Sequence, residues 1–265
     1  TGNTIEDLYY NGGFPTVARN TVTGATPLTI TDPDLDLSGI SGNTYTAESP
    51  NVHLYGTLDG SLTLGLELVD GLGGTYTLAG SGTSQIFRVA AGGSLTVEPG
   101  TEIDIRSAYG AGLYVGGLLR ATAATFVRGS IYVLDAGRAE LADCNMGSSR
   151  VTFRSGSAGV LDNLGGVSWS LSIASPDVSI VNGITARIMD VSAAVSVADA
   201  TLDSLSVSAA ASISGSTIRH VSATEGSPSL TGNAIERLTF EGGTPQVTGN
   251  TIEDLYYNGG FPTVA

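Results

Sequence analysis

The side chains best placed to do chemistry are three aspartates in the stretch TDPDLDLSG. Asp32, Asp34 and Asp36 alternate with other residues, so on a β-strand their carboxylates would project from one face. Carboxylate and backbone carbonyl oxygens are the ligands that Ca²⁺ prefers, which makes this stretch the candidate metal site. The stretch lacks the glycine and the closing glutamate of an EF-hand loop, and a solvated acidic strand face is the alternative. We expect no cofactor, with calcium at these three residues as the alternative.

Catalytic candidates are sparse. The two histidines, His53 in NVHLYG and His220 in TIRHVS, lie beside no pair of acids, and the carboxylates Asp199 and Asp203 stand apart from other acids. A lysine base is impossible because the chain has no lysine; all 11 basic residues are arginine. Acid–base cleavage of a sugar polymer needs clustered carboxylates. The sequence therefore predicts no catalytic residue and no enzymatic activity.

The chain repeats itself. Residues 248–265 read TGNTIEDLYYNGGFPTVA, the same eighteen residues as 1–18, which gives a period of 247 residues. We interpret the chain as one period of a tandemly repeated polypeptide, in which Arg19 would follow Ala265 again. The alternative is that the sequence was taken with overlapping ends from a longer periodic polypeptide. That alternative presupposes the same repeat.

A shorter period of seventeen residues lies inside the long one. The segments ISGSTIRHVSATEGSPS, LTGNAIERLTFEGGTPQ and VTGNTIEDLYYNGGFPT superimpose in their apolar, asparagine and turn positions. Units of this size cannot bury an apolar face alone and must stack on their neighbours, so the chain is predicted to be a solenoid. Residues at equivalent positions of successive units would stack on one another, and we call each such set a column. The predicted structural columns are Ile218, Ile235 and Ile252; Val221, Leu238 and Leu255; and Asn233 and Asn250, continued by Asn3 and Asn20.

The elements that would carry these columns are short β-strands. The 37 glycines, abundant Ser and Thr, and short runs of Val, Ile and Leu are typical of strands between tight turns, and no stretch has a sustained helical period. The fold class is predicted to be all-β, a right-handed parallel β-helix with coils of roughly 17–20 residues. Without a linker or a charge block, 1–265 is expected to form one continuous domain.

Stacking gives each column a role. Apolar columns would form a dry core, and asparagines one coil apart would bond through their side-chain amides. On the surface, Arg219 would face Glu236 and Arg237 would face Asp254. Val17 and Val264 are expected to stack one repeat on the next.

Charge and composition exclude several partners. The net charge is −14 and no basic stripe is present, which argues against nucleic acid. No apolar run has transmembrane length, so we expect no membrane insertion. One cysteine, Cys144, allows no internal disulfide.

The phrases LTGNAIERL, VTGNTIEDL and GGSLTVEPGTEIDI resemble coils of right-handed parallel β-helices of the pectin-lyase-like type. More narrowly, the chain is similar to the β-helical repeats of giant bacterial cell-surface and secreted fibre proteins. The resemblance implies a structural role and an extracellular or cell-surface location. Polysaccharide lyases and hydrolases also have that fold, so the resemblance leaves a carbohydrate-active enzyme as an alternative function.

We therefore expect a structural repeat of a long extracellular rod, serving as surface filament, sheath, stalk or adhesin shaft. Its partners would be neighbouring copies of the repeat, end to end, with lateral self-association or surface glycans as further possibilities. The alternatives are a carbohydrate-active β-helix enzyme and an adhesin module that binds a glycan or a receptor.

Overall fold

A computed structural model describes residues 2–12, 16–34, 36–69, 71–78, 86–105, 112–166 and 168–265 of the chain. Over these residues the secondary structure is β-strand and turn, with no helix. The strands stack in parallel as a β-solenoid of about 12 turns, which confirms the predicted fold class. The chain divides into two compact units, residues 1–132 and 133–265, which are described separately below.

The first unit holds short strands of two to five residues and one longer strand. They are β1 (Thr4–Ile5), β2 (Leu8–Tyr10), β3 (Val17–Ala18), β4 (Thr21–Val22), β5 (Leu28–Ile30), β6 (Ile40–Ser41), β7 (Thr44–Tyr45), β8 (Val52–Leu54), β9 (Gly56–Leu58), β10 (Ser61–Leu64), β11 (Thr75–Leu78), β12 (Phe87–Val89), β13 (Ser94–Val97), β14 (Glu102–Ile105), β15 (Leu113–Val115), β16 (Leu118–Thr122) and β17 (Thr125–Val133).

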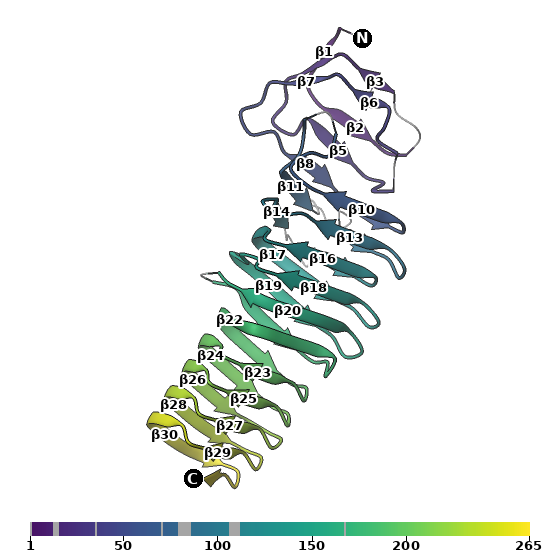
Figure 1. The fold of residues 1–265 in the computed structure, drawn as a ribbon. Helices are drawn as coiled ribbons and strands as arrows, with labels where there is room; N and C mark the ends of the chain where they lie inside the picture. Colours follow the sequence, from purple (N-terminus) through teal and green to yellow (C-terminus); the bar gives the residue numbers. More distant parts are fainter. Residues whose placement is uncertain are drawn as a thin grey trace. The chain divides into compact units, whose positions relative to one another are not determined.

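The second unit has longer strands on one side of each coil and short strands on another. They are β18 (Arg138–Ala142), β19 (Ser148–Phe153), β20 (Ala158–Leu164), β21 (Ser170–Ile173), β22 (Val178–Val191), β23 (Ser196–Ala198), β24 (Thr201–Val207), β25 (Ser212–Ser214), β26 (Thr217–Ala223), β27 (Ser229–Thr231), β28 (Ala234–Glu241), β29 (Gln246–Thr248), β30 (Thr251–Gly259) and β31 (Thr263–Val264). Figure 1 shows β22, β24, β26, β28 and β30 stacked in order, with β23, β25, β27 and β29 beside them.

Coil length in the second unit agrees with the prediction to within one residue. The spacing of paired residues gives the length of each turn. It is twenty for the pair Arg138 and Ala158, sixteen for Thr201 and Thr217, and seventeen for Ile235 and Ile252. Coils of nearly constant length let inward residues such as Ile235 and Ile252 pair directly with one another.

Coil length in the first unit differs from the prediction. Thr4 pairs with Thr21 at the expected spacing of seventeen, but the spacing between Leu28 and Val52 is twenty-four. A still wider interval of thirty-three joins Ser61 to Ser94. The paired strands β5 and β8, and β10 and β13, keep a constant register across these wider intervals. The short sequence period therefore does not reveal these coils.

The core of each unit is a set of inward columns. In the second unit Ile218 and Val221 lie under Ile235 and Leu238, and all four side chains are buried. Trp169, which directly precedes β21, is also fully buried. In parallel strands about 4.8 Å apart, such columns exclude water along the length of the stack.

One corner of the coil is built the same way in turn after turn. Its residue has a positive φ, as at Asp143 (53°), Asp199 (53°) and Gly232 (65°), a conformation that Gly, Asn and Asp tolerate best. The backbone N–H there donates to a carbonyl of the following coil, for example Gly232 to Thr248 at 3.1 Å. The residue after the corner points inward, which is how the asparagine column is aimed at the core.

The expectation of one continuous domain over residues 1–265 stays a prediction, as does the right-handed sense of the coil.

Candidate functional site

The asparagine column of the second unit forms a hydrogen-bonded ladder. Asn233 donates both its backbone N–H and its Nδ2 to Oδ1 of Asn250, at 2.8 and 2.9 Å. One coil earlier the backbone N–H of Ser216 donates to Oδ1 of Asn233 at 2.9 Å. Asn233 is buried, and buried amides are stabilising only when their hydrogen bonds are made.

The first unit contains a second asparagine ladder of the same kind. Asn3 donates its backbone N–H and its Nδ2 to Oδ1 of Asn20, each at 3.2 Å. Asn20 in turn donates both groups to Asn43, at 3.0 and 3.2 Å. The sequence columns missed Asn43 because a longer coil separates it from Asn20; its signal is the triplet SGN, which matches TGN at Asn233 and Asn250.

Between Asn43 and Ser216, the described residues that follow such a corner are not amidic. They are buried and apolar or weakly polar, and they include Thr101, Ala124, Cys144, Leu164, Ile184 and Ala200. The ladder therefore belongs to the coils on either side of the eighteen-residue repeat. That distribution makes the coils around the repeat the candidate functional site.

The two copies of the repeat have opposite neighbours. In the first copy, Ile5 pairs with Val22 and Leu8 with Leu28, both in the coil that follows. In the second copy, Ile252 and Leu255 pair with Ile235 and Leu238 in the coil that precedes. Val17 pairs with Ile40 and Val264 with Val247; whether these two valines stack one repeat on the next stays a prediction.

The second copy leaves apolar side chains open on its other side. Leu255 is 37% exposed, whereas its equivalent Leu8 is 7% exposed. Tyr257 packs on Phe240 with ring centroids 5.3 Å apart and still remains exposed. Phe261 is 84% exposed. This face of the coil has the apolar columns of a core without a covering strand.

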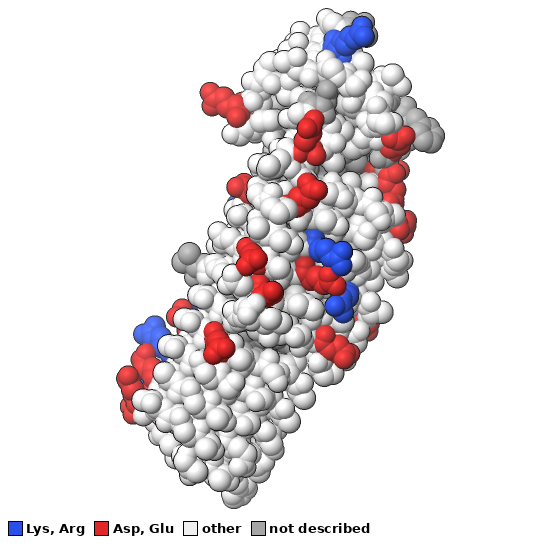
Figure 2. All heavy atoms as spheres, in the orientation of Figure 1, with Lys and Arg blue, Asp and Glu red and all other residues white. Residues whose placement is uncertain are grey.

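Charged columns cross the outer surface of the same coils. Arg219 Nε lies 3.3 Å from Glu236 Oε2, and Arg237 Nη2 lies 3.8 Å from Asp254 Oδ2, as the sequence columns predict. By contrast, the strands β23, β25, β27, β29 and β31 contain no charged residue. The face of these strands seen in Figure 2 is correspondingly uncoloured.

Asp32, Asp34 and Asp36 do not lie on a strand, so the predicted strand face is wrong; calcium binding at these residues stays a prediction. Asp32, Asp34 and Asp36 fall in the turn between β5 and β6. The two Asp34 carboxylate oxygens accept the backbone N–H groups of Asp59 and Gly60, at 2.8 and 2.7 Å. The backbone and hydroxyl of Ser38 hydrogen-bond Asp36 and lower the pKa of its carboxyl. These carboxylates close turns, and within the described ranges no three potential ligands come together as a metal site.

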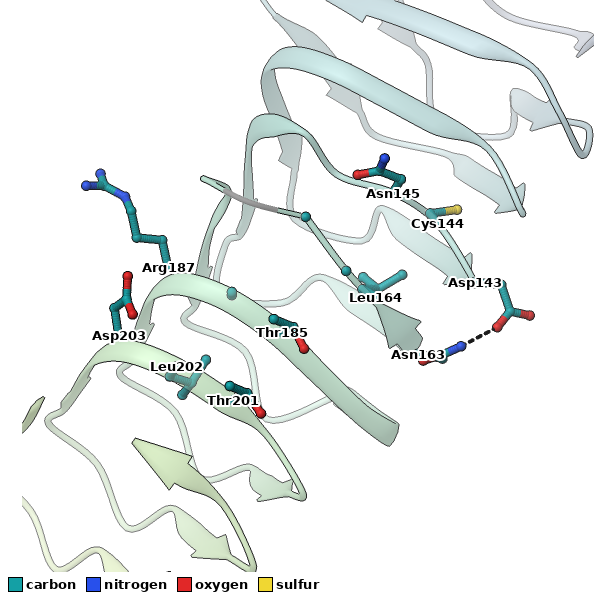
Figure 3. A pocket seen from close by; sticks show the side chains of 13 residues that line it. Asp143, Cys144, Asn145, Asn163, Leu164, Thr185, Arg187, Thr201, Leu202 and Asp203 are labelled. Atoms are coloured by element: carbon teal, nitrogen blue, oxygen red, sulfur yellow. Dashed lines mark hydrogen bonds between the residues drawn. The ribbon is translucent and has the colours of Figure 1, made fainter. Parts of the chain in front are cut away.

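A groove opens on the second unit, with a volume of about 730 Å³. It lies where Gly165 and Gly166 provide no side chains, beside the threonines Thr185 and Thr201 of the next two coils. Figure 3 shows its two carboxylates, Asp143 and Asp203, at opposite sides, with Asp143 accepting a hydrogen bond from Asn163 (2.7 Å). Arg187 also lines the groove, and Cys144 is buried at its wall. The groove thus presents a mixture of hydrogen-bond donors and acceptors over a small apolar floor.

The histidines fall in separate columns. His53 pairs with Thr29 and Thr77 in the first unit, and His220 pairs with Arg237 in the second. Among the carboxylates, Asp104 binds Arg128 through both oxygens at 2.7 and 2.8 Å, which raises the pKa of Arg128. Neither histidine is placed against a pair of acids by these columns.

No family model, no curated protein and no solved structure matches the chain. The described residues contain no helix of the length and apolarity that a membrane span requires.

Proposed function

We propose that this chain is a structural repeat of a long extracellular rod, joined end to end to further copies of itself. The observation that supports this most directly is the complementarity of the two copies of the eighteen residues. One copy uses the edge that faces the following coil, and the other uses the edge that faces the preceding coil. A single copy between two repeats would use both edges at once.

The ladder distribution supports the same proposal. In a tandem chain, Asn250 would take the place of Asn3 and donate to Asn20 of the next period. The ladder would then run without interruption through Asn233, Asn250, Asn20 and Asn43, which are the coils around the junction. A continuous stack of parallel strands resists bending and extension through its backbone hydrogen bonds, which is the property a shaft needs.

The extracellular or cell-surface location rests on composition and on the family resemblance. A net charge of −14 keeps long rods soluble by mutual repulsion. Lateral contact between rods would meet the least repulsion at the uncharged strands β23, β25, β27, β29 and β31.

Electron microscopy of a chain with two periods tests the proposal. Twelve turns at ~4.8 Å each predict that the second period lengthens the particle by roughly 60 Å. Two compact particles joined by a flexible link would contradict it.

A second candidate function is supported by the groove at Gly165. Hydroxyl, amide and carboxylate groups over an apolar floor suit a neutral polyhydroxy ligand, which is the glycan-binding alternative. A Cβ at Gly165 would meet no atom within 4 Å, so Gly165→Trp would fill the groove without disturbing the coil. Loss of glycan-array binding in this variant, with binding retained in the surface variant Ser229→Trp, would favour this candidate; an array without signal for the parent chain would remove it.

A further inference from the structure

We infer that the end coil 248–265 accepts one specific partner, the coil 19–43 of another period, and that a notch at Gly24 selects it. This inference rests on the proposed function, since it identifies the surface through which successive repeats join. It goes further in assigning polarity and specificity to that surface.

The notch is visible in the first copy of the repeat. A Cβ at residue 24 would come 2.5 Å from the carbonyl oxygen of Glu6 and would overlap the Asp7 carboxylate. The Gly24 backbone N–H donates to the Glu6 carbonyl at 2.7 Å. Only a residue without a side chain leaves room here for the backbone of the neighbouring coil and for its aspartate.

Three extra residues on the partner coil create this notch. The spacing between Ile5 and Val22 is seventeen, but the spacing between Leu8 and Leu28 is twenty. The coil that contains Gly24 therefore bulges opposite Glu6 and Asp7, where a regular coil would continue as a strand. A coil that lacked this bulge would place side chains against the two acids.

At a junction between periods, the acids concerned are Glu253 and Asp254. Arg237 of the preceding coil already lies 3.8 Å from Asp254. At the junction the Asp254 carboxylate would therefore lie between the Arg237 guanidinium on one side and the Gly24 notch on the other. The apolar columns agree with this placement: Ile252 would meet Val22 and Leu255 would meet Leu28, as Ile5 and Leu8 do in the first copy.

The nearest competing partner is an identical end coil, for example 1–18 of a separate chain. Its apolar and asparagine columns would match, but Glu253 would face Glu6 and Asp254 would face Asp7. Like charges directly opposite on paired strands are destabilising. The acids therefore oppose stacking of identical coils and favour the coil with the notch.

Trypsin provides the test, because it cleaves after arginine and Arg19 directly follows the first copy of the repeat. In a tandem chain an arginine would follow each internal copy. In a two-period chain, Arg19 of the second period lies at the internal junction, and Arg19 of the first period lies beside the first coil. We expect Gly24→Val in the second period to speed cleavage at the internal Arg19 by at least about tenfold, since cleavage follows local opening. The matched control is Gly24→Val in the first period, which should speed only removal of the segment that ends at the first Arg19.

A second variant removes a different contact. Asn20→Ala in the second period takes away the acceptor for Asn250 and should also speed internal cleavage, while leaving the notch intact. If internal cleavage is slow in the unsubstituted chain and stays slow with either second-period variant, the inference is overturned and the proposed function stands. The first Arg19 already lies in the interface between the first copy and the coil that follows it. If the internal Arg19 of the unsubstituted chain is cut faster than the first Arg19, no junction forms, and the proposed function fails along with the inference.

Discussion

The same eighteen residues adopt different strand structures in the two places where they occur. Residues 4–10 form two short strands, β1 and β2, separated by Glu6 and Asp7, whereas the equivalent residues 251–257 lie within the single nine-residue strand β30. The sequence is identical, so the neighbouring coil must decide. A neighbouring coil whose residues pair at a constant spacing of seventeen keeps the strand continuous. A neighbouring coil with the bulge at Gly24 interrupts it.

Burial follows the same rule. Leu8 is covered by the coil that begins at Arg19, and Leu255 has a neighbour only on the side of Leu238. Solenoid stability is a sum of coil-to-coil interfaces. The comparison therefore predicts that equivalent substitutions in the two copies differ in cost, and that the difference shrinks once both copies are covered.

The largest difference is expected for the buried leucines. Leu8→Ala should cost about 2–4 kcal/mol of unfolding free energy, while Leu255→Ala should cost about 1 kcal/mol, because less apolar surface is lost. Urea denaturation of the single-period chain measures both. In a two-period chain the loss of unfolding free energy caused by Leu255→Ala should rise to that caused by Leu8→Ala. Equal losses in the single-period chain would contradict the predicted difference between the two copies.

Tyr76 sharpens the contrast between the long coils and the short ones. Its hydroxyl donates to the Gly65 carbonyl at 2.7 Å and closes a loop that belongs to the long coils of the first unit. Burial raises the pKa of Tyr76 from 10.0 to about 12. The protonated form is therefore favoured in the fold, so its stabilisation is complete below pH 10 and is lost as the pH rises towards 12.

We expect the stability of the first unit to fall over that alkaline range by an amount on the order of 2 kcal/mol. Tyr76→Phe should remove this pH dependence while lowering stability at neutral pH. Urea denaturation at pH values between about 9 and about 12 would measure it. An unchanged alkaline profile in Tyr76→Phe would assign the effect to another group.

The asparagine ladder is expected to give a smaller difference. Asn20 both accepts from Asn3 and donates to Asn43, so Asn20→Ala should cost about 1–3 kcal/mol by leaving buried partners unpaired. Asn250 is bonded only to residues of its own and the preceding coils, and Asn250→Ala should cost less, about 1 kcal/mol. Differential scanning calorimetry would rank them; the reverse order would contradict a ladder that gains strength from both sides.

The exposed ion pairs should matter least. Arg219→Ala breaks the ion pair with Glu236, in which both side chains are about half exposed. The substitution should lower the free energy of unfolding by no more than about 1 kcal/mol. The effect should vanish in about 1 M salt. A salt-independent loss of several kcal/mol would mean that the arginine stem, and not its charge, is the stabilising group.

The sequence predicted those parts of the fold where coil length is constant. Ile218, Ile235 and Ile252 could be aligned because the chain spends the same number of residues on each of these turns. Alignment by a constant period is not possible between Leu28 and Val52, because the loops there differ in length from those of the other coils. Their length depends on tertiary packing and leaves no period in the sequence.

Turn chemistry caused the other errors. Alternating acids at Asp32, Asp34 and Asp36 resemble a strand face, but the proline at position 33 and the backbone N–H groups that Asp34 caps favour a turn. The Gly24 notch could not have been predicted either. Its role depends on how closely the backbone of Glu6 approaches it, which a single sequence does not reveal.

The most direct test of the account is a cryo-electron microscopy structure of the two-period chain. The account predicts that Nδ2 of Asn250 lies about 3 Å from Oδ1 of Asn20 in the second period, a normal hydrogen-bond distance. It also predicts that the internal copy of the repeat is interrupted at Glu253 and Asp254 opposite Gly24, as the first copy is at Glu6 and Asp7. An uninterrupted β30 with no coil stacked on it would contradict the account, because the two periods would then be separate bodies.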